Sequence, residues 1–209
     1  MKNAFRLAAG ILGFAALVLQ YVMVLMGDIG AGPISRTINF FSYFTVLTNV
    51  LVVLAFLAPI AWPQTGVGKF FARPGVRTAI ASYVIIVNAV VFFILRHLTN
   101  LQGLDFLTDL LLHYIMPALF VLDWVFLVPK ETLKISHVAW WLVFPVIYLG
   151  WTFIHGAASG FFPYPFLNTT ELGLVRVLIN EGLLLVVFLV LGFVLVTGGK
   201  MLRLGTPAP

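Results

Sequence analysis

Six long apolar stretches alternate with short polar segments along the chain. Each has about the 20 residues that a helix needs to cross the hydrocarbon core of a bilayer. The runs are continuous, whereas strands of a membrane β-barrel alternate over about 10 residues. The pattern predicts an all-α integral membrane protein, a single domain over 1–209 with six transmembrane helices. The expected spans are Phe5–Met26, Thr37–Ala61, Val76–Leu98, Asp105–Val128, Ser136–Gly156 and Glu171–Thr197.

The basic residues are distributed unequally between the two sides of this bundle. Nine flank one side: Lys2, Arg6, Lys69, Arg73, Arg77, Lys130, Lys134, Lys200 and Arg203. Three flank the other side: Arg36, Arg96 and Arg176. Loops rich in Lys and Arg remain in the cytoplasm. We therefore expect both termini to be cytoplasmic, and the chain to be a multi-pass protein of a bacterial cytoplasmic (inner) membrane.

The composition agrees with a bilayer as the main partner. Hydrophobic residues make up 62% of the chain and charged residues only 9%, against about 25% charged in soluble domains. This excludes an ordinary soluble protein, a disordered chain and a nucleic-acid-binding domain. The chain has no cysteine, which excludes disulfides, thiol nucleophiles and Cys-ligated metals. The histidines have no tight metal-ligand spacing, so we expect no metal and no cofactor.

Polar side chains interrupt the apolar stretches at a similar depth. Counted from the outer ends, Thr45, Asn88 and His113 lie about eight residues in, and Asn180 and Glu181 about nine or ten. At about 1.5 Å per residue, they lie roughly 12–15 Å below the outer surface. Ionisable groups in a membrane helix are costly and usually face the bundle interior. These five residues therefore predict one polar layer in the outer half.

Helical spacing extends this layer. Asn49 follows Thr45 by four residues and Asp109 precedes His113 by four, so each pair shares a helix face. The layer then holds a hydroxyl, an imidazole, carboxylates and amides, which are the groups of a buried hydrolytic site. Further polar residues are expected nearer the outer mouth: Arg96, His97, Asp109, His155 and Arg176.

Each of these residues also has a simpler structural interpretation. A threonine in a membrane helix often bonds back to its own helix, and a histidine often bonds a neighbouring one. Arg96 and Arg176 can extend to the outer headgroups, and Glu181 can form a buried ion pair with Arg176. Asp123, beside Trp124 near the inner end, is expected to be structural. The common depth of so many polar groups favours a site over packing alone.

Three blocks of sequence resemble a known family. Phe41-Ser42-Tyr43-Phe44-Thr45-Val46-Leu47-Thr48-Asn49, His113-Tyr114-x-x-Pro117 followed by Asp123-Trp124, and Tyr164-Pro165-Phe166-Leu167-Asn168 resemble the Pr6Pr family of bacterial six-helix membrane proteins. That family is similar to the androgen-induced-gene-1 and ADTRP proteins of animals. Those are six-span hydrolases that cleave fatty acid esters of hydroxy fatty acids with a threonine and a histidine. By motif position, the resemblance implies Thr45 and His113 as the catalytic pair.

The leading hypothesis is therefore an intramembrane hydrolase of lipid esters. Thr45 would attack the ester carbonyl, His113 would accept its proton, and Asp109 or Glu181 would orient the imidazole. The predicted binding residues, which would stabilise the oxyanion or hold the lipid substrate, are Asn49, Asn88, Arg96, Asp109, His155, Arg176, Asn180 and Glu181. One alternative is a small transporter or channel. A transport path would need polar residues as far as the cytoplasmic end, but we expect only Asp123 and a few hydroxyls in the inner half. The other alternative is a non-catalytic lipid-binding protein.

Overall fold

The computed structural model describes residues 1–27, 32–98 and 100–204, with the backbone alone described for 202–204. Within these ranges every regular element is helical. Six helical segments are long and apolar enough to cross a membrane, so the chain is a multi-pass integral membrane protein and the predicted fold class is confirmed. They are Lys2–Met26, Phe44–Ala61, Pro74–Leu95, Gly103–Leu127, His137–Ser159 and Leu174–Met201.

Several of these segments combine two or three elements. The single-helix spans are α1 (Lys2–Met26), α3 (Phe44–Ala61) and α11 (Leu174–Leu204). The third span is α5 (Pro74–Val90) with a π-helical turn, η1 (Val91–Leu95). The fourth is α6 (Gly103–Leu110), a second π-helical turn, η2 (Leu111–Ile115), and α7 (Met116–Leu127). The fifth joins α8 (His137–Trp141) to α9 (Val143–Ser159).

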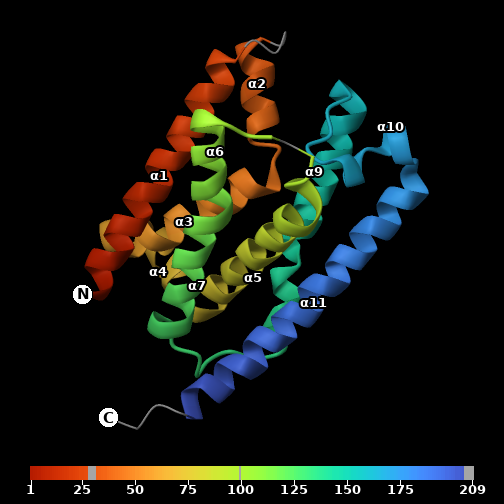
Figure 1. The fold of residues 1–209 in the computed structure, drawn as a ribbon. Coiled ribbons are helices and arrows are strands. Elements are labelled where there is room, and N and C mark those ends of the chain that lie inside the picture. Colours follow the sequence, from red (N-terminus) through yellow and green to blue (C-terminus); the bar gives the residue numbers. More distant parts are fainter. Residues whose placement is uncertain (28–31, 99, 205–209) are drawn as a thin grey trace.

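Shorter helices lie between the spans. They are α2 (Pro33–Phe40), α4 (Gly66–Ala72), the 3₁₀ turn η3 (Pro165–Leu167) and α10 (Thr169–Leu172). The sixth span was expected from Glu171, but Gly173 separates α10 from α11 with φ of +74°, a conformation that favours glycine. In Figure 1 the beginning of α1 and the end of α11 lie toward the same end of the bundle.

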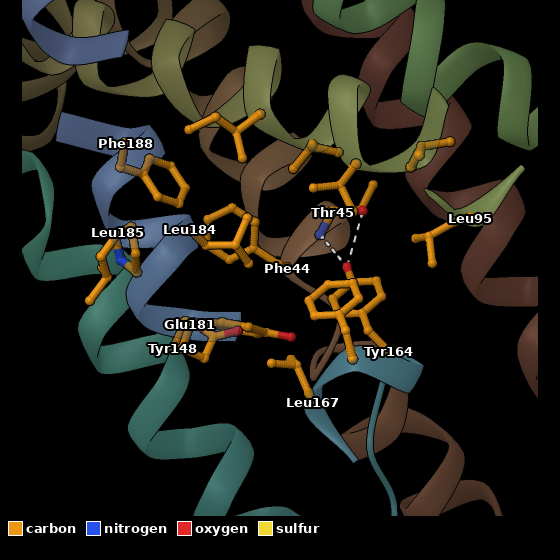
Figure 2. A pocket seen from close by; sticks show the side chains of 16 residues that line it. Phe44, Thr45, Leu95, Tyr148, Tyr164, Leu167, Glu181, Leu184, Leu185 and Phe188 are labelled. Carbon is orange, nitrogen blue, oxygen red and sulfur yellow. Dashed lines mark hydrogen bonds between the residues drawn. The ribbon is translucent and has the colours of Figure 1, made fainter. Parts of the chain in front are cut away.

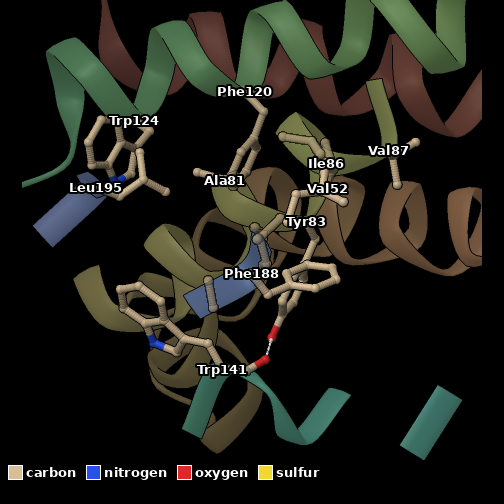
Figure 3. Close-up of a cluster of buried hydrophobic side chains, with 14 of the residues drawn as sticks. Val52, Ala81, Tyr83, Ile86, Val87, Phe120, Trp124, Trp141, Phe188 and Leu195 are labelled. Atoms are coloured by element: carbon tan, nitrogen blue, oxygen red, sulfur yellow. Dashed lines mark hydrogen bonds between the residues drawn. The ribbon is translucent and has the colours of Figure 1, made fainter. Parts of the chain in front are cut away.

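Helix α5 lies at the centre and packs against α3, α7 and α11 (Figure 1). Helix α1 covers α3 closely because Gly10 and Gly13 leave room for side chains of the neighbouring helices. A Cβ atom at Gly10 would lie 2.4 Å from Leu57, and one at Gly13 would lie 2.5 Å from Met116. Small residues allow this close approach in membranes. Figure 3 shows the buried cluster around α5, where the Tyr83 hydroxyl donates a hydrogen bond to the Trp141 carbonyl at 2.6 Å.

The second predicted span, Thr37–Ala61, is interrupted. Helix α2 ends at Phe40 and α3 begins at Phe44, so the membrane-crossing helix starts seven residues later than expected. The break leaves polar groups of Ser42 outside a regular helix, and α9 provides partners for them. The Tyr148 hydroxyl donates to the Ser42 carbonyl at 3.1 Å, and Trp151 Nε1 donates to Ser42 Oγ at 2.9 Å. Side chains of another span therefore stabilise this break, because buried backbone groups require partners.

A charged cluster is buried near the inner end of the bundle. Asp123 lies 2.6 Å from Arg6 and 2.6 Å from Arg77, and the side chain of Asp123 is fully buried. The inner half therefore carries more charge than expected, because Arg6 and Arg77, which were expected to flank the inner side, are buried within the bundle. Their pairing with Asp123 links α1, α5 and α7. The cytoplasmic location of the termini stays a prediction from the distribution of basic residues.

Candidate functional site

Thr45 is the second residue of α3, and its side chain is buried. It is therefore at a helix N-terminus and not in the middle of a continuous span. The first N–H groups of a helix have no partner within the helix. Here the N–H of Thr45 donates to the Tyr164 hydroxyl at 3.2 Å, and Thr45 Oγ1 lies 3.2 Å from the same oxygen. Tyr164 thus caps α3 and holds the threonine hydroxyl.

Tyr164 belongs to the loop between α9 and α11 and lies between two prolines. Its ring stacks on Phe166, with 5.3 Å between centroids and 2° between planes, and contacts the edge of Tyr43. Burial raises the pKa of Tyr164 to about 12, although its hydrogen bond with Thr45 acts in the opposite direction. The phenol therefore stays protonated at neutral pH. Tyr164 was not among the predicted site residues. Its position within the Tyr-Pro-Phe motif was the signal in the sequence.

His113 lies within the π-helical turn η2, one turn after Asp109. Its Nδ1 is buried and lies 2.8 Å from Asp109 Oδ1, a contact that has the distance but not the alignment of a hydrogen bond. The structure therefore brings together the predicted base and one of its two predicted carboxylates. Glu181, the other candidate, forms no ion pair with His113 in the described ranges.

The backbone around His113 is held by two amide side chains. The N–H of Met116 bonds the carbonyl of Leu111 and so is not available to the carbonyl of Leu112. Pro117 has no N–H to donate to the carbonyl of His113. Side chains donate to these two carbonyls instead. Asn49 Nδ2 donates to the Leu112 carbonyl at 3.1 Å and to the Thr45 carbonyl at 3.0 Å. Asn88 Nδ2 donates to the His113 carbonyl at 2.6 Å. Asn49 and Asn88, two of the three predicted oxyanion donors with Asn180, thus donate to backbone carbonyls.

Two pockets meet at Thr45. The larger, of about 810 Å³, is lined by Thr45, Tyr164, His113 and Asp109, with Arg96 also on its wall. The smaller, of about 60 Å³, is lined by Thr45, Tyr164 and Glu181 among apolar side chains (Figure 2). Thr45 and His113 therefore face a common pocket, but the hydrogen-bond partner of the threonine hydroxyl among the described residues is Tyr164 and not the imidazole.

The remaining predicted residues lie apart from these pockets. His155 Nε2 pairs with Asn39 Oδ1 at 2.9 Å and stacks on Trp151. It therefore links α9 to α2. Asn180 donates to the Phe166 carbonyl at 2.9 Å, which positions the loop that carries Tyr164. Arg176 is exposed and lines neither pocket.

No group of three His, Cys, Asp or Glu side chains within residues 1–27, 32–98 and 100–204 could hold a metal ion. No family model, curated protein or solved structure matches the chain.

Proposed function

We propose that the chain is an integral membrane hydrolase that cleaves lipid esters, with Thr45 as the nucleophile and His113 as the base. The observation that carries this proposal is that the buried hydroxyl at the start of α3 and the His113–Asp109 pair line the same 810 Å³ pocket. A nucleophile, a base and a carboxylate that faces the base are the groups needed for acyl transfer. A pocket of this size suits an amphiphilic substrate.

In the proposed reaction, Thr45 Oγ1 forms a bond to the ester carbonyl carbon while its proton passes to His113. Nδ1 faces Asp109, so Nε2 is the nitrogen that accepts this proton across the pocket. His113 then returns the proton to the departing alcohol, which leaves an acyl-threonine. A water molecule, deprotonated by the same imidazole, attacks the acyl group and regenerates the hydroxyl.

The negative charge that develops on the carbonyl oxygen needs donors. Asn49 and Asn88 bond backbone carbonyls, so this role passes to the Tyr164 hydroxyl, which accepts the N–H of Thr45 at 3.2 Å and can donate its own proton. The start of a helix also favours an anion because the helix dipole is positive there. Loss of one such donor typically costs about 10²–10³ in rate.

A cation in the large pocket and the sequence motifs both favour one substrate class. Arg96 lines that pocket with its guanidinium 3.8 Å above the Phe92 ring, where it can bind the free carboxylate of a fatty acid ester of a hydroxy fatty acid. The motifs around Thr45, His113 and Tyr164 resemble those of the Pr6Pr family. The similarity of that family to the animal hydrolases of these esters favours the same substrate class. We place the protein, with this activity, in a bacterial cytoplasmic membrane.

A fluorophosphonate probe tests the catalytic pair. The probe should label the wild-type protein and not Thr45→Ala or His113→Ala. Two control variants, Thr152→Ala and His155→Ala, should be labelled like the wild type, because both residues lie in α9 and line neither pocket. Equal labelling of all five proteins would refute the roles of Thr45 and His113.

Non-catalytic lipid binding is the second candidate, and the Thr45–Tyr164 hydrogen bond favours it. A hydroxyl held by a phenol can serve as a purely structural contact. Turnover of a hydroxy-fatty-acid ester in liposomes, with Thr45→Ala as control, separates the two candidates. Transport is disfavoured because Arg77, Phe56 and Phe120 are fully buried between the pocket and the inner end, where the guanidinium lies over both rings.

A further inference from the structure

The small pocket on the other side of Thr45 has an unusual lining. Its walls carry five aromatic side chains and one carboxyl group: Phe44, Tyr148, Tyr164, Phe166, Phe188 and Glu181. The other lining residues are apolar apart from Thr45. Figure 2 shows the side chain of Glu181 extending from α11 toward Leu167 and Tyr164. A carboxyl group is thus presented to a small, largely hydrophobic space.

The carboxyl group of Glu181 stands alone among the residues that the structure describes. No hydrogen bond or ion pair joins it to any residue in the described part of the chain. The two nearby hydroxyls are engaged elsewhere, since Tyr148 donates to the Ser42 carbonyl and Tyr164 pairs with Thr45. Arg176, expected to pair with it, is exposed and outside the pocket. An unpaired carboxylate inside a membrane protein is costly and points to function.

The chemistry of the pocket defines its ligand. A carboxylate attracts a cation or a hydrogen-bond donor, and aromatic faces attract organic cations within about 6 Å of the ring centroid. An uncharged alkyl chain would gain nothing from the carboxylate. The volume of about 60 Å³ is that of roughly two water molecules, so it accommodates a primary ammonium with one or two carbon atoms but not a long chain.

We propose that the pocket lined by Glu181 and the five aromatic side chains is a binding site for a small alkylammonium group. Glu181 pairs with the ammonium, and the rings surround its carbon atoms. Such a group is carried both by soluble amines and by the ethanolamine headgroup of phospholipids. The site does not depend on Thr45 chemistry, so it stands whether or not the protein hydrolyses esters.

The thermal stability of the purified protein in detergent tests this site. Ethylammonium chloride should raise the Tm of the wild type in a saturable manner, whereas ethanol and sodium chloride at equal concentrations should not. Glu181→Gln should weaken the apparent affinity at least tenfold, because the ammonium loses the carboxylate charge that strengthens its hydrogen bond. Glu171→Gln, which alters an exposed carboxyl group outside the pocket, should behave like the wild type. Equal shifts with ethanol, or an unchanged affinity in Glu181→Gln, would overturn the proposal.

A second variant keeps the test decisive if Glu181→Gln does not fold. Leu185→Phe retains the carboxyl group but fills the pocket that Leu185 lines, and it should also abolish the ethylammonium shift; a retained shift would refute the site. Nanodiscs then distinguish the two sources of the ligand. A weaker apparent affinity in phosphatidylethanolamine than in phosphatidylglycerol would identify the lipid headgroup as the occupant. Equal affinities would identify a soluble amine.

Discussion

The buried cluster around Asp123 leads to the sharpest prediction about stability. One carboxylate is the shared counterion of two guanidinium groups: Arg6 Nε lies 2.6 Å from Oδ1, and Arg77 Nη2 lies 2.6 Å from Oδ2. The side chains of Arg6 and Arg77 are only 9% and 2% exposed. Asp123→Asn keeps the shape but removes the charge, so that both cations lose their counterion.

Removing one partner of a buried ion pair typically costs about 3–5 kcal/mol. We expect at least this loss in the free energy of unfolding, or a factor of roughly 10² to 10³ or more in the equilibrium constant. Reversible unfolding in mixed micelles with increasing dodecyl sulfate, followed by tryptophan fluorescence, measures it. Asp105→Asn, in the exposed first turn of α6, is the matched control and should change stability by less than about 1 kcal/mol.

Replacing the whole charged cluster should restore stability. A triple variant, Arg6→Leu with Arg77→Met and Asp123→Leu, contains no uncompensated charge and should be close to the wild type, because apolar replacements of a buried ionic cluster are often neutral. A loss below about 1 kcal/mol for Asp123→Asn, or a triple variant as unstable as the single one, would refute it. The first result would mean that water solvates these guanidinium groups, and the second that the hydrogen bonds of Arg77 to the Ala55 and Phe71 carbonyls outweigh the charge.

Three further predictions concern the loop, the π-helical turn and the inner end. Burial raises the pKa of Tyr164 to about 12, so the folded protein keeps a proton that the unfolded chain releases near pH 10. The free energy of unfolding should therefore fall as pH rises from about 10 to 12, and a Tyr164→Phe variant should show a shallower fall in unfolding measured across that range. Asn88→Leu leaves the His113 carbonyl without its donor and should destabilise the protein by about 1–3 kcal/mol in the same micelle assay; an unchanged value would mean that water replaces the amide. Lys130 donates to three carbonyls near the end of α7 at 2.7–2.9 Å, so Lys130→Met should lower the free energy of unfolding by about 1.5–3 kcal/mol. The control Lys134→Met, at an exposed position, should lower it by less than about 0.5 kcal/mol. Equal effects of the two substitutions would contradict the capping role of Lys130.

The break before Thr45 illustrates why helix boundaries inside a membrane are hard to predict. Residues 37–61 are apolar enough to form one continuous helix, and no proline or glycine lies near Ser42. The break persists because Tyr148 and Trp151, more than 100 residues later, bond the polar groups of Ser42. Such a partner cannot be identified from the local pattern.

The amide side chains give a contrasting case. Pro117 has no N–H, so the carbonyl four residues earlier, at His113, must find another donor. This requirement is visible in the sequence, but the identity of the donor is not. Only the packing of α5 against η2 assigns Asn88 to that carbonyl.

The sequence by itself determined the solvent and the class of fold, because six apolar stretches of sufficient length can cross a bilayer only as helices whose backbone groups bond internally. It also determined which helix faces carry the Asp109–His113 pair, because side chains four residues apart lie together in a helix. The tertiary structure decided what those groups meet: Tyr164 at Thr45, aromatic side chains around Glu181, and Asp123 between two arginines. The reason is that hydrogen bonds and ion pairs between helices depend on helix rotation and crossing. These are set by the packing of side chains along the whole bundle and not by the local pattern of the chain.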